Sequence, residues 1–222
     1  QSMLNLCATL IKKLDEASVN YCHWKSNESL TLALNGEGDL DFLVAPRDAP
    51  KFLKELGALG FREARVESSP TMPGIKHFLG FDAASGKLVH LHVYFRLLTA
   101  GSLEKNALFD LTDKFLASSV SGPSGVPVPP TEAELVLLCV RKALEQISPI
   151  EHLLFLQDQA NVQKELAWLF ARSDRGVAES LWREWFPGTC ESLLWKTADA
   201  LQSGDFSARV KIGLALRGLP YT

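Results

Sequence analysis

The sequence lacks the features that define several broad classes of protein. No apolar run approaches the roughly 18 residues that are needed to cross a bilayer. The net charge of the 222 residues is only −3, which gives no sign of a nucleic-acid-binding or membrane-seeking surface. The content of 46% hydrophobic and 22% charged residues is ordinary, and it excludes a disordered or collagen-like chain. We therefore expect a globular protein.

Cysteines are also scarce, and their spacing excludes common metal and redox motifs. The sequence has four, at Cys7, Cys22, Cys139 and Cys190. None forms a C-x-x-C pair, so neither a zinc ribbon nor a thioredoxin motif is expected. The first residues show no charged-then-apolar signal peptide, and we interpret Gln1-Ser2 as a cloning remnant before an initiating Met3. These features predict a cytoplasmic protein with reduced thiols.

A segment rich in proline and glycine separates two parts of different character. Residues 118–130 contain four prolines and two glycines, which cannot continue a helix or a central strand. The following Thr131-Glu132-Ala133-Glu134 matches a capping box at the start of a helix. We predict an α+β protein with a mixed sheet and flanking helices over residues 3–118, a linker at 119–130 and a helical domain over 131–222.

The hydrophobic patterns differ between these parts. In the first part they predict helices over 6–14, 27–34 and 49–59, and strands over 19–24, 39–44, 61–66, 75–81 and 87–97. In the second part they predict helices over 132–146, 150–156, 162–171, 177–185, 191–201 and 209–216. The tryptophans of the second part recur at helical spacing, which is typical of a helical core.

The strongest chemical signal is the segment Gly38-Asp39-Leu40-Asp41-Phe42. In a strand, alternate residues share a face, so Asp39 and Asp41 are expected together, with the apolar residues facing the core. Two adjacent carboxylates need a cation or a proton between them. Mg²⁺ favours such oxygen ligands, and paired ions of this kind support nucleotidyl transfer. Solvated acids at a sheet edge are the alternative interpretation.

A second candidate element precedes these acids, at Lys25-Ser26-Asn27. This segment follows one predicted strand and opens a predicted helix, whose N-terminal N–H groups suit phosphate oxygens. Lys25 would add positive charge and Ser26 a hydrogen bond. A plain N-cap at Ser26 or Asn27 is compatible with the same sequence.

The predicted strand over 87–97 alternates cleanly between apolar and polar residues. Its polar row consists of His90, His92, Tyr94 and Arg96. A solvent-facing sheet surface would give the same alternation, but imidazoles can also bind a metal ion or accept a proton near neutral pH. Arg96 suits phosphate binding. Lys76-His77 is a weaker candidate that we leave outside the predicted site.

Residues 6–96 resemble the nucleotidyltransferase superfamily typified by DNA polymerase beta. The resemblance lies in a strand, a serine-bearing turn, a short helix and then Gly-Asp-x-Asp with apolar residues after it. It implies that the Ser26 segment holds a nucleoside triphosphate and that Asp39 and Asp41 bind two metal ions, with Mg²⁺ or Mn²⁺ as cofactor. Lys25 stands where the family usually carries glycine. At the position where the family carries a third carboxylate, this sequence has His90 or His92.

A narrower resemblance lies in Tyr-Cys-His-Trp-Lys-Ser-Asn-Glu at 21–28 and His-Leu-His-Val-Tyr-Phe-Arg-Leu at 90–97. These segments are similar to an uncharacterised branch that often precedes a thymidylate-kinase-like domain, which implies a kinase-like partner in a longer chain. The 222 residues themselves contain no G-x-x-x-x-G-K-[ST] loop.

Three functions are therefore open at this point. The first is a nucleotidyltransferase that moves a nucleoside monophosphate from a triphosphate to a hydroxyl acceptor. Asp39, Asp41 and His90 would act as catalytic and metal-binding residues, and Lys25, Ser26, Asn27, His92 and Arg96 would bind the nucleotide. The second is an inactive nucleotide-binding module that regulates a kinase. The third is a metallohydrolase that uses the two aspartates and two histidines around one transition metal.

Overall fold

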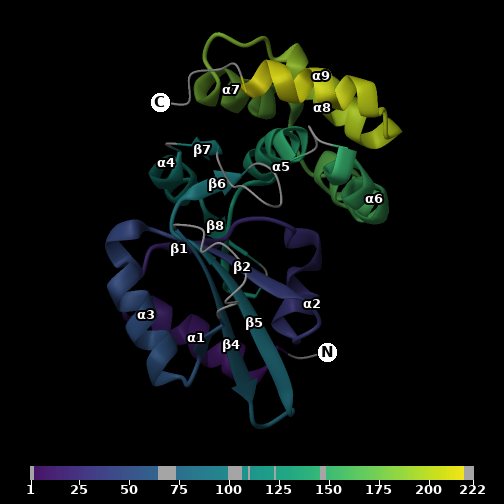
Figure 1. Cartoon of the computed structure of the whole chain (residues 1–222). Coiled ribbons are helices and arrows are strands. Elements are labelled where there is room, and N and C mark those ends of the chain that lie inside the picture. The colour runs from purple at the N-terminus through teal and green to yellow at the C-terminus, as the bar shows by residue number, and fades with distance from the viewer. Residues whose placement is uncertain are drawn as a thin grey trace. The chain divides into compact units, whose positions relative to one another are not determined.

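The computed structural model describes residues 3–64, 74–99, 107–109, 111–122, 124–145 and 149–217. It confirms an α+β fold with a mixed five-stranded sheet and a helical C-terminal region (Figure 1). The chain forms two compact units. The N-terminal unit comprises Gln1–Leu97 and Thr112–Pro129, and the C-terminal unit comprises Leu98–Leu111 and Pro130–Thr222. The grouping of residues 98–111 with the C-terminal unit differs from the predicted boundary, which placed them in the N-terminal part.

The N-terminal unit contains the large sheet and the helices around it. Its helices are α1 (Asn5–Glu16), α2 (Leu30–Leu34), α3 (Ala49–Ala58) and α4 (Thr112–Ala117), with 3-10 turns at Asn27–Ser29 and Pro46–Asp48. Its strands are β1 (Tyr21–His23), β2 (Asp39–Val44), β3 (Arg62–Ala64), β4 (Ile75–Asp82) and β5 (Lys87–Tyr94). Two short strands, β8 (Val120–Ser121) and β9 (Pro127–Val128), pair with each other.

The order of strands in the sheet is β1-β2-β5-β4-β3. Strand β5 pairs parallel to β2, whereas the other neighbouring strands pair antiparallel. The predicted strands at 75–81 and 87–97 do pair as neighbours, as β4 and β5. The predicted helix over 27–34 is wrong in its first turn, because residues 27–29 form a 3-10 turn before the five residues of α2.

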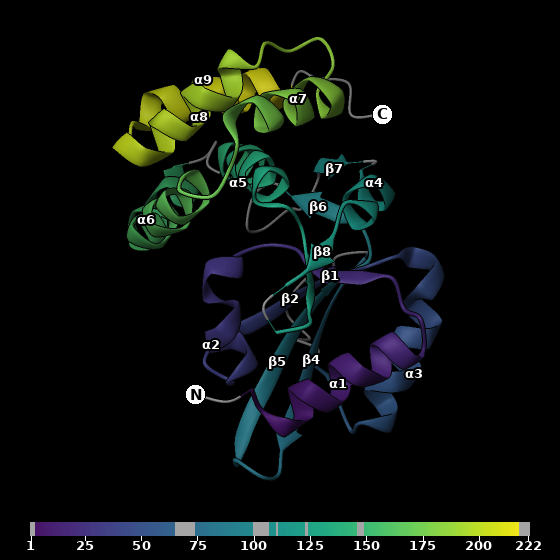
Figure 2. The same ribbon diagram turned by 180° about the vertical axis from the view of Figure 1, so that it is seen from behind.

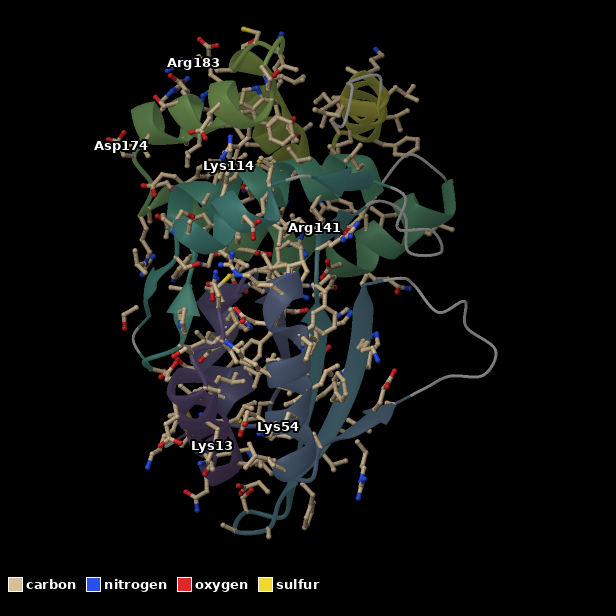
Figure 3. All side chains as sticks on the ribbon, turned by 90° about the vertical axis from the view of Figure 1, so that its left-hand side faces the viewer. Lys13, Lys54, Lys114, Arg141, Asp174 and Arg183 are labelled. Atoms are coloured by element: carbon tan, nitrogen blue, oxygen red, sulfur yellow. The ribbon has the colours of Figure 1, made fainter. Side chains whose placement is uncertain are left out.

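One face of the sheet forms the core of the N-terminal unit. Leu40 and Phe42 of β2 are buried there, together with Val89, Leu91 and Val93 of β5. Helices α1 and α3 pack on this face, and the opposite views of Figures 1 and 2 show both helices on the same side of the strands. Their charged residues point outward, as the labelled Lys13 and Lys54 show in Figure 3. The other face of the sheet carries the candidate site.

Gly80 allows β4 to pass close to the buried ring of Phe61. A Cβ atom at Gly80 would lie 2.5–2.7 Å from three atoms of that ring. We therefore expect Gly80→Ala to lower the free energy of unfolding by about 1–3 kcal/mol, the usual cost of overpacking. Gly57→Ala in α3 is the control, because its Cβ would meet no atom within 4 Å and alanine favours helix by up to about 1 kcal/mol. Urea denaturation measures both, and equal stability of the two variants would contradict the close approach.

The C-terminal unit is built around one central helix. Its helices are α5 (Thr131–Glu145), α6 (Pro149–Phe170), α7 (Arg175–Trp185), α8 (Ser192–Ser203) and α9 (Phe206–Arg217). Helix α5 contacts the other four, and most of its residues from Ala133 to Leu144 are buried. Two further short strands, β6 (Leu97–Thr99) and β7 (Ala107–Phe109), pair with each other. None of the described helices combines the length and the apolar character of a membrane-spanning segment.

Two local predictions for the C-terminal unit are wrong. The predicted helices over 150–156 and 162–171 are a single helix, α6, because the polar residues between them continue the helical backbone. The predicted capping box does not form, since the N–H of Glu134 donates to the carbonyl of Pro130 and the hydroxyl of Thr131 donates to the carbonyl of Arg172. Asp174 caps α7 by accepting from the Val177 N–H, and it is labelled at the start of that helix in Figure 3.

Candidate functional site

The two aspartates of β2 lie on the face of the sheet opposite the core, next to the histidines of β5. The parallel register pairs Asp39 with His90 and Asp41 with His92. Residues that are paired directly across two strands share a face, so the four side chains project together. Exposure to solvent differs along this face, because the side chain of Asp39 is 55% exposed and that of Asp41 is only 10% exposed. The site therefore has an open end and a buried end.

Each aspartate contacts the histidine beside it. His90 Nδ1 lies 2.7 Å from Asp39 Oδ1, and His92 Nδ1 lies 3.2 Å from Asp41 Oδ1. The sequence left open whether His90 or His92 would face the acids. The structure places both there, one with each carboxylate, because β5 runs in the same direction as β2.

Strand β4 adds a third imidazole. His77 pairs with His92 across the strands, and the two rings stack with centroids 4.2 Å apart. His77 Nδ1 also lies 3.1 Å from His90 Nε2. Burial lowers the pKa of His77, and the imidazoles of His92 and His90 lower it further. The sequence contained His77 as part of Lys76-His77, but nothing local showed that β4 would lie next to β5.

Lys25 contacts the buried aspartate. Its Nζ lies 2.9 Å from Asp41 Oδ1 and 3.4 Å from the Tyr94 hydroxyl. The ammonium group also lies over the rings of Trp24 and Tyr94, 5.5 and 5.3 Å from their centroids, within the range of cation–π attraction. The side chain of Lys25 is only 17% exposed. Lys25, which the sequence assigned to the triphosphate, is therefore an ion-pair partner of Asp41 in this structure.

The charge of Asp41 is stabilised in spite of its burial. Burial alone would raise the pKa of this carboxyl group, but the Lys25 charge, the hydrogen bond from His92 and the nearby His23 lower it. The lowering effects prevail, so the pKa of Asp41 lies well below its ordinary value. The fold thus maintains a buried, ionised carboxylate at the closed end of the site.

The Ser26 segment differs from the predicted helix start. Ser26 has a left-handed backbone, with φ of 57°, and its side chain does not cap the 3-10 turn of residues 27–29. Asn27 Oδ1 lies 2.8 Å from His23 Nδ1. Because the turn has only three residues, it lacks the aligned peptide dipoles of a longer helix. The proposed binding of phosphate at a helix N-terminus therefore loses its structural basis, although Ser26 still follows Lys25 directly.

Arg96 lies outside the contacts of the site. Strand β5 ends at Tyr94, two residues earlier, and Arg96 is exposed. Within the described part of the chain, Arg96 forms no ion pair with the acids of the site. The polar row that the sequence predicts along this strand therefore continues in the sheet only as far as Tyr94.

The donor types of this face suit a divalent cation. Carboxylate oxygens are the usual ligands of Mg²⁺, and imidazole nitrogens also suit Mn²⁺. The ligand atoms of Asp39, Asp41, His90 and His92 form two separate acid–imidazole pairs. No three ligand atoms of these residues lie within 4.8 Å of one another in the described structure. The residues fit a cation at either carboxylate by their chemistry, and Lys25 already contacts one of the two.

Comparisons with known proteins do not identify the chain. No family model matches it, and no curated protein does. Among solved structures, the chain is similar to JHP933 from Helicobacter pylori, with a TM-score of 0.36 and 13% sequence identity. The alignment covers 96% of this chain and 90% of JHP933. At this level of similarity the match carries no argument about function.

His23, on the core face next to the site, is expected to make stability depend on pH. Burial lowers its pKa from the ordinary value of 6.5, and its Nε2 has no hydrogen-bond partner within the described residues. Because the unfolded chain binds a proton that the folded chain excludes, stability should fall as the pH drops below about 6.5, by up to about 1.4 kcal/mol per pH unit. Urea denaturation at pH 7.5 and 5.5 should show a smaller decrease for His23→Gln than for the unmodified chain. Equal decreases would contradict this assignment.

Proposed function

We propose that the protein is a metal-dependent nucleotidyltransferase that uses Mg²⁺ or Mn²⁺ and moves a nucleoside monophosphate from a nucleoside triphosphate to a hydroxyl acceptor. One observation supports this proposal most strongly. Asp39 and Asp41 share a sheet face with His90 and His92 in parallel register. This arrangement brings carboxylate oxygens that can bind a cation and imidazole nitrogens that can accept a proton to the same face of the sheet. The resemblance at residues 6–96 implies such a site.

The two ends of the site suggest different roles for its residues. The carboxylates of Asp39 and Asp41 would hold the cationic charge of the site, which would neutralise the phosphates and stabilise the attacking and leaving oxygens. The Asp39–His90 pair is the more exposed, with side chains 55% and 32% accessible, so an acceptor hydroxyl can approach it from solvent. His90, oriented by Asp39 through its Nδ1, would accept the proton of that hydroxyl at Nε2, with the hydroxyl replacing the contact of this nitrogen with His77. Lys25 would keep Asp41 ionised at the closed end.

The proposal is tested by following the α-phosphate. The full chain is incubated with each α-³²P-labelled nucleoside triphosphate, Mg²⁺ or Mn²⁺, and a pool of small hydroxyl compounds from a deproteinised cell extract. We expect label to move to a new species together with release of pyrophosphate, and EDTA should abolish both. Binding of nucleotide without any movement of label, under all these conditions, would contradict catalysis.

A non-catalytic nucleotide-binding module is the second candidate, and one observation favours it. Lys25 already neutralises Asp41, and in the described strands this face carries no carboxylate besides the two aspartates. Such a module, associated with a kinase-like partner, would be stabilised against heat by a nucleoside triphosphate but would transfer no label. The labelling assay above distinguishes the two candidates.

A metallohydrolase built around one transition metal has less support from the geometry. The rings of His77, His90 and His92 are stacked nearly parallel, with interplanar angles of 6–23°. The nitrogen lone pairs of an imidazole lie in the plane of its ring, so stacked rings do not direct them toward one ion. Metal analysis of the purified chain that shows one tightly held Zn²⁺ would reverse this assessment.

A further inference from the structure

We infer that Lys25 occupies the place of one cation at Asp41, so that the site accepts one divalent ion for each bound nucleotide instead of two. This inference rests on the proposed function and specifies its metal requirement. The fixed positive charge would come from the chain itself, at the closed end of the site. The divalent ion would then be held on the Asp39 side.

The contacts of Lys25 show that its ammonium group has a defined position. Asp41 Oδ1 lies 2.9 Å away, the Tyr94 hydroxyl lies 3.4 Å away, and the rings of Trp24 and Tyr94 face the charge. The backbone of Trp24 is itself held next to β2, because its main-chain N–H donates to the main-chain carbonyl of Asp41. An ammonium group fixed by a carboxylate, a hydroxyl and two aromatic rings occupies the position where a cation on Asp41 would bind.

The charge of the site supports the same conclusion. Asp39 and Asp41 contribute two negative charges, Lys25 contributes one positive charge, and the imidazoles add no negative charge. The described strands place no third carboxylate on this face. A divalent ion placed on Asp41 would lie against the ammonium group of Lys25, 2.9 Å from the same carboxylate, and would be repelled by it, whereas an ion on the Asp39 side avoids that contact.

Direct measurement of Mn²⁺ binding tests the inference without any need for turnover. The free Mn²⁺ signal in electron paramagnetic resonance is followed while the full chain is titrated, first alone and then with a non-hydrolysable nucleoside triphosphate. We expect the unmodified chain to hold one Mn²⁺ per bound nucleotide. Lys25→Met should bind Mn²⁺ at least about tenfold more tightly, because a unit positive charge in contact with Asp41 has been removed, and should hold a second ion with the nucleotide.

Matched variants separate charge from packing. Lys25→Arg keeps the positive charge and should bind Mn²⁺ like the unmodified chain. Lys142→Met removes another ion-paired lysine, whose side chain is 15% exposed and lies 3.0 Å from Asp158, and it should also leave Mn²⁺ binding unchanged. The double variant Lys25→Met with Asp41→Asn removes both members of the pair and should lose the gain in affinity. Thermal unfolding shows whether each variant is folded.

Several outcomes would overturn the inference. It fails if folded Lys25→Met binds Mn²⁺ no more tightly than the unmodified chain, or if two ions bind per nucleotide while Lys25 is present. Should Lys25→Met not fold, a gain in affinity in Lys25→Arg would still overturn it, because the charge would then not be what excludes an ion. Failure of the proposed function is distinct, since it would appear as absence of label transfer while Mn²⁺ binding follows the expected order.

Discussion

Replacing Asp41 by asparagine is expected to lower nucleotidyl transfer by at least about 10³-fold, the order of magnitude for losing a preorganised charge at a reacting phosphate. The substitution keeps the shape of the side chain but removes the negative charge that the fold maintains at the closed end of the site, against Lys25. The residual rate of label transfer from the α-³²P-labelled triphosphate measures the effect.

Asp48→Asn is the matched control for this substitution. The side chain of Asp48 is 10% exposed, the same as that of Asp41, and it also contacts a lysine, with Lys51 Nζ 3.3 Å away. It lies in the turn at residues 46–48 and accepts a hydrogen bond from the Asn20 N–H, and it has no contact with the histidines among its described partners. We expect this variant to transfer label at the rate of the unmodified chain. Equal rates for Asp41→Asn and Asp48→Asn would reject the catalytic proposal.

Phe42→Ala is expected to lower the free energy of unfolding by about 3–5 kcal/mol, as is usual for truncation of a buried aromatic residue. Phe42 is fully buried, and its ring lies 5.3 Å from that of Tyr21 and 6.4 Å from that of Phe52. The cavity would open directly beneath β2, which carries Asp39 and Asp41 on its other face. Urea denaturation gives the change in stability.

The comparison for Phe42 is Phe81, whose side chain on β4 is 61% exposed. Phe81→Ala removes the same group from a position in contact with solvent, and its effect on the free energy of unfolding should stay within about 0.5 kcal/mol. A loss of stability of similar size in both variants would show that the core does not lie on the Phe42 side of the sheet.

The alternation of residues was enough to predict which side chains of each strand share a face. Leu40 and Phe42 are buried as predicted, and Val89, Leu91 and Val93 are buried on the same side. This works because the period of a strand is fixed by its backbone and does not depend on its neighbours. The fold class was predictable for the same reason, since it follows from the types of element and their order.

The partners of the site residues were not predictable in this way. The contacts of Asp41 with Lys25 and His92 join residues from three segments of the chain, and they depend on which strands become neighbours. A hydrophobic pattern does not specify strand order, so His77 could not be assigned to the site and His90 could not be distinguished from His92. The left-handed backbone of Ser26 was equally hidden, because this conformation usually indicates glycine, asparagine or aspartate.

The parallel pairing of β2 with β5 has a consequence for folding kinetics. Asp39 and His90 are in contact although they lie 51 positions apart in the sequence, and the intervening chain contains α3, β3 and β4. Contacts of such long range form slowly, because the entropy of closing the loop is lost before the contact stabilises it. Renaturing protein should therefore regain helical circular dichroism well before it regains the Mn²⁺ binding that we propose for this site. A nascent chain has neither histidine partner until β5 has been synthesised.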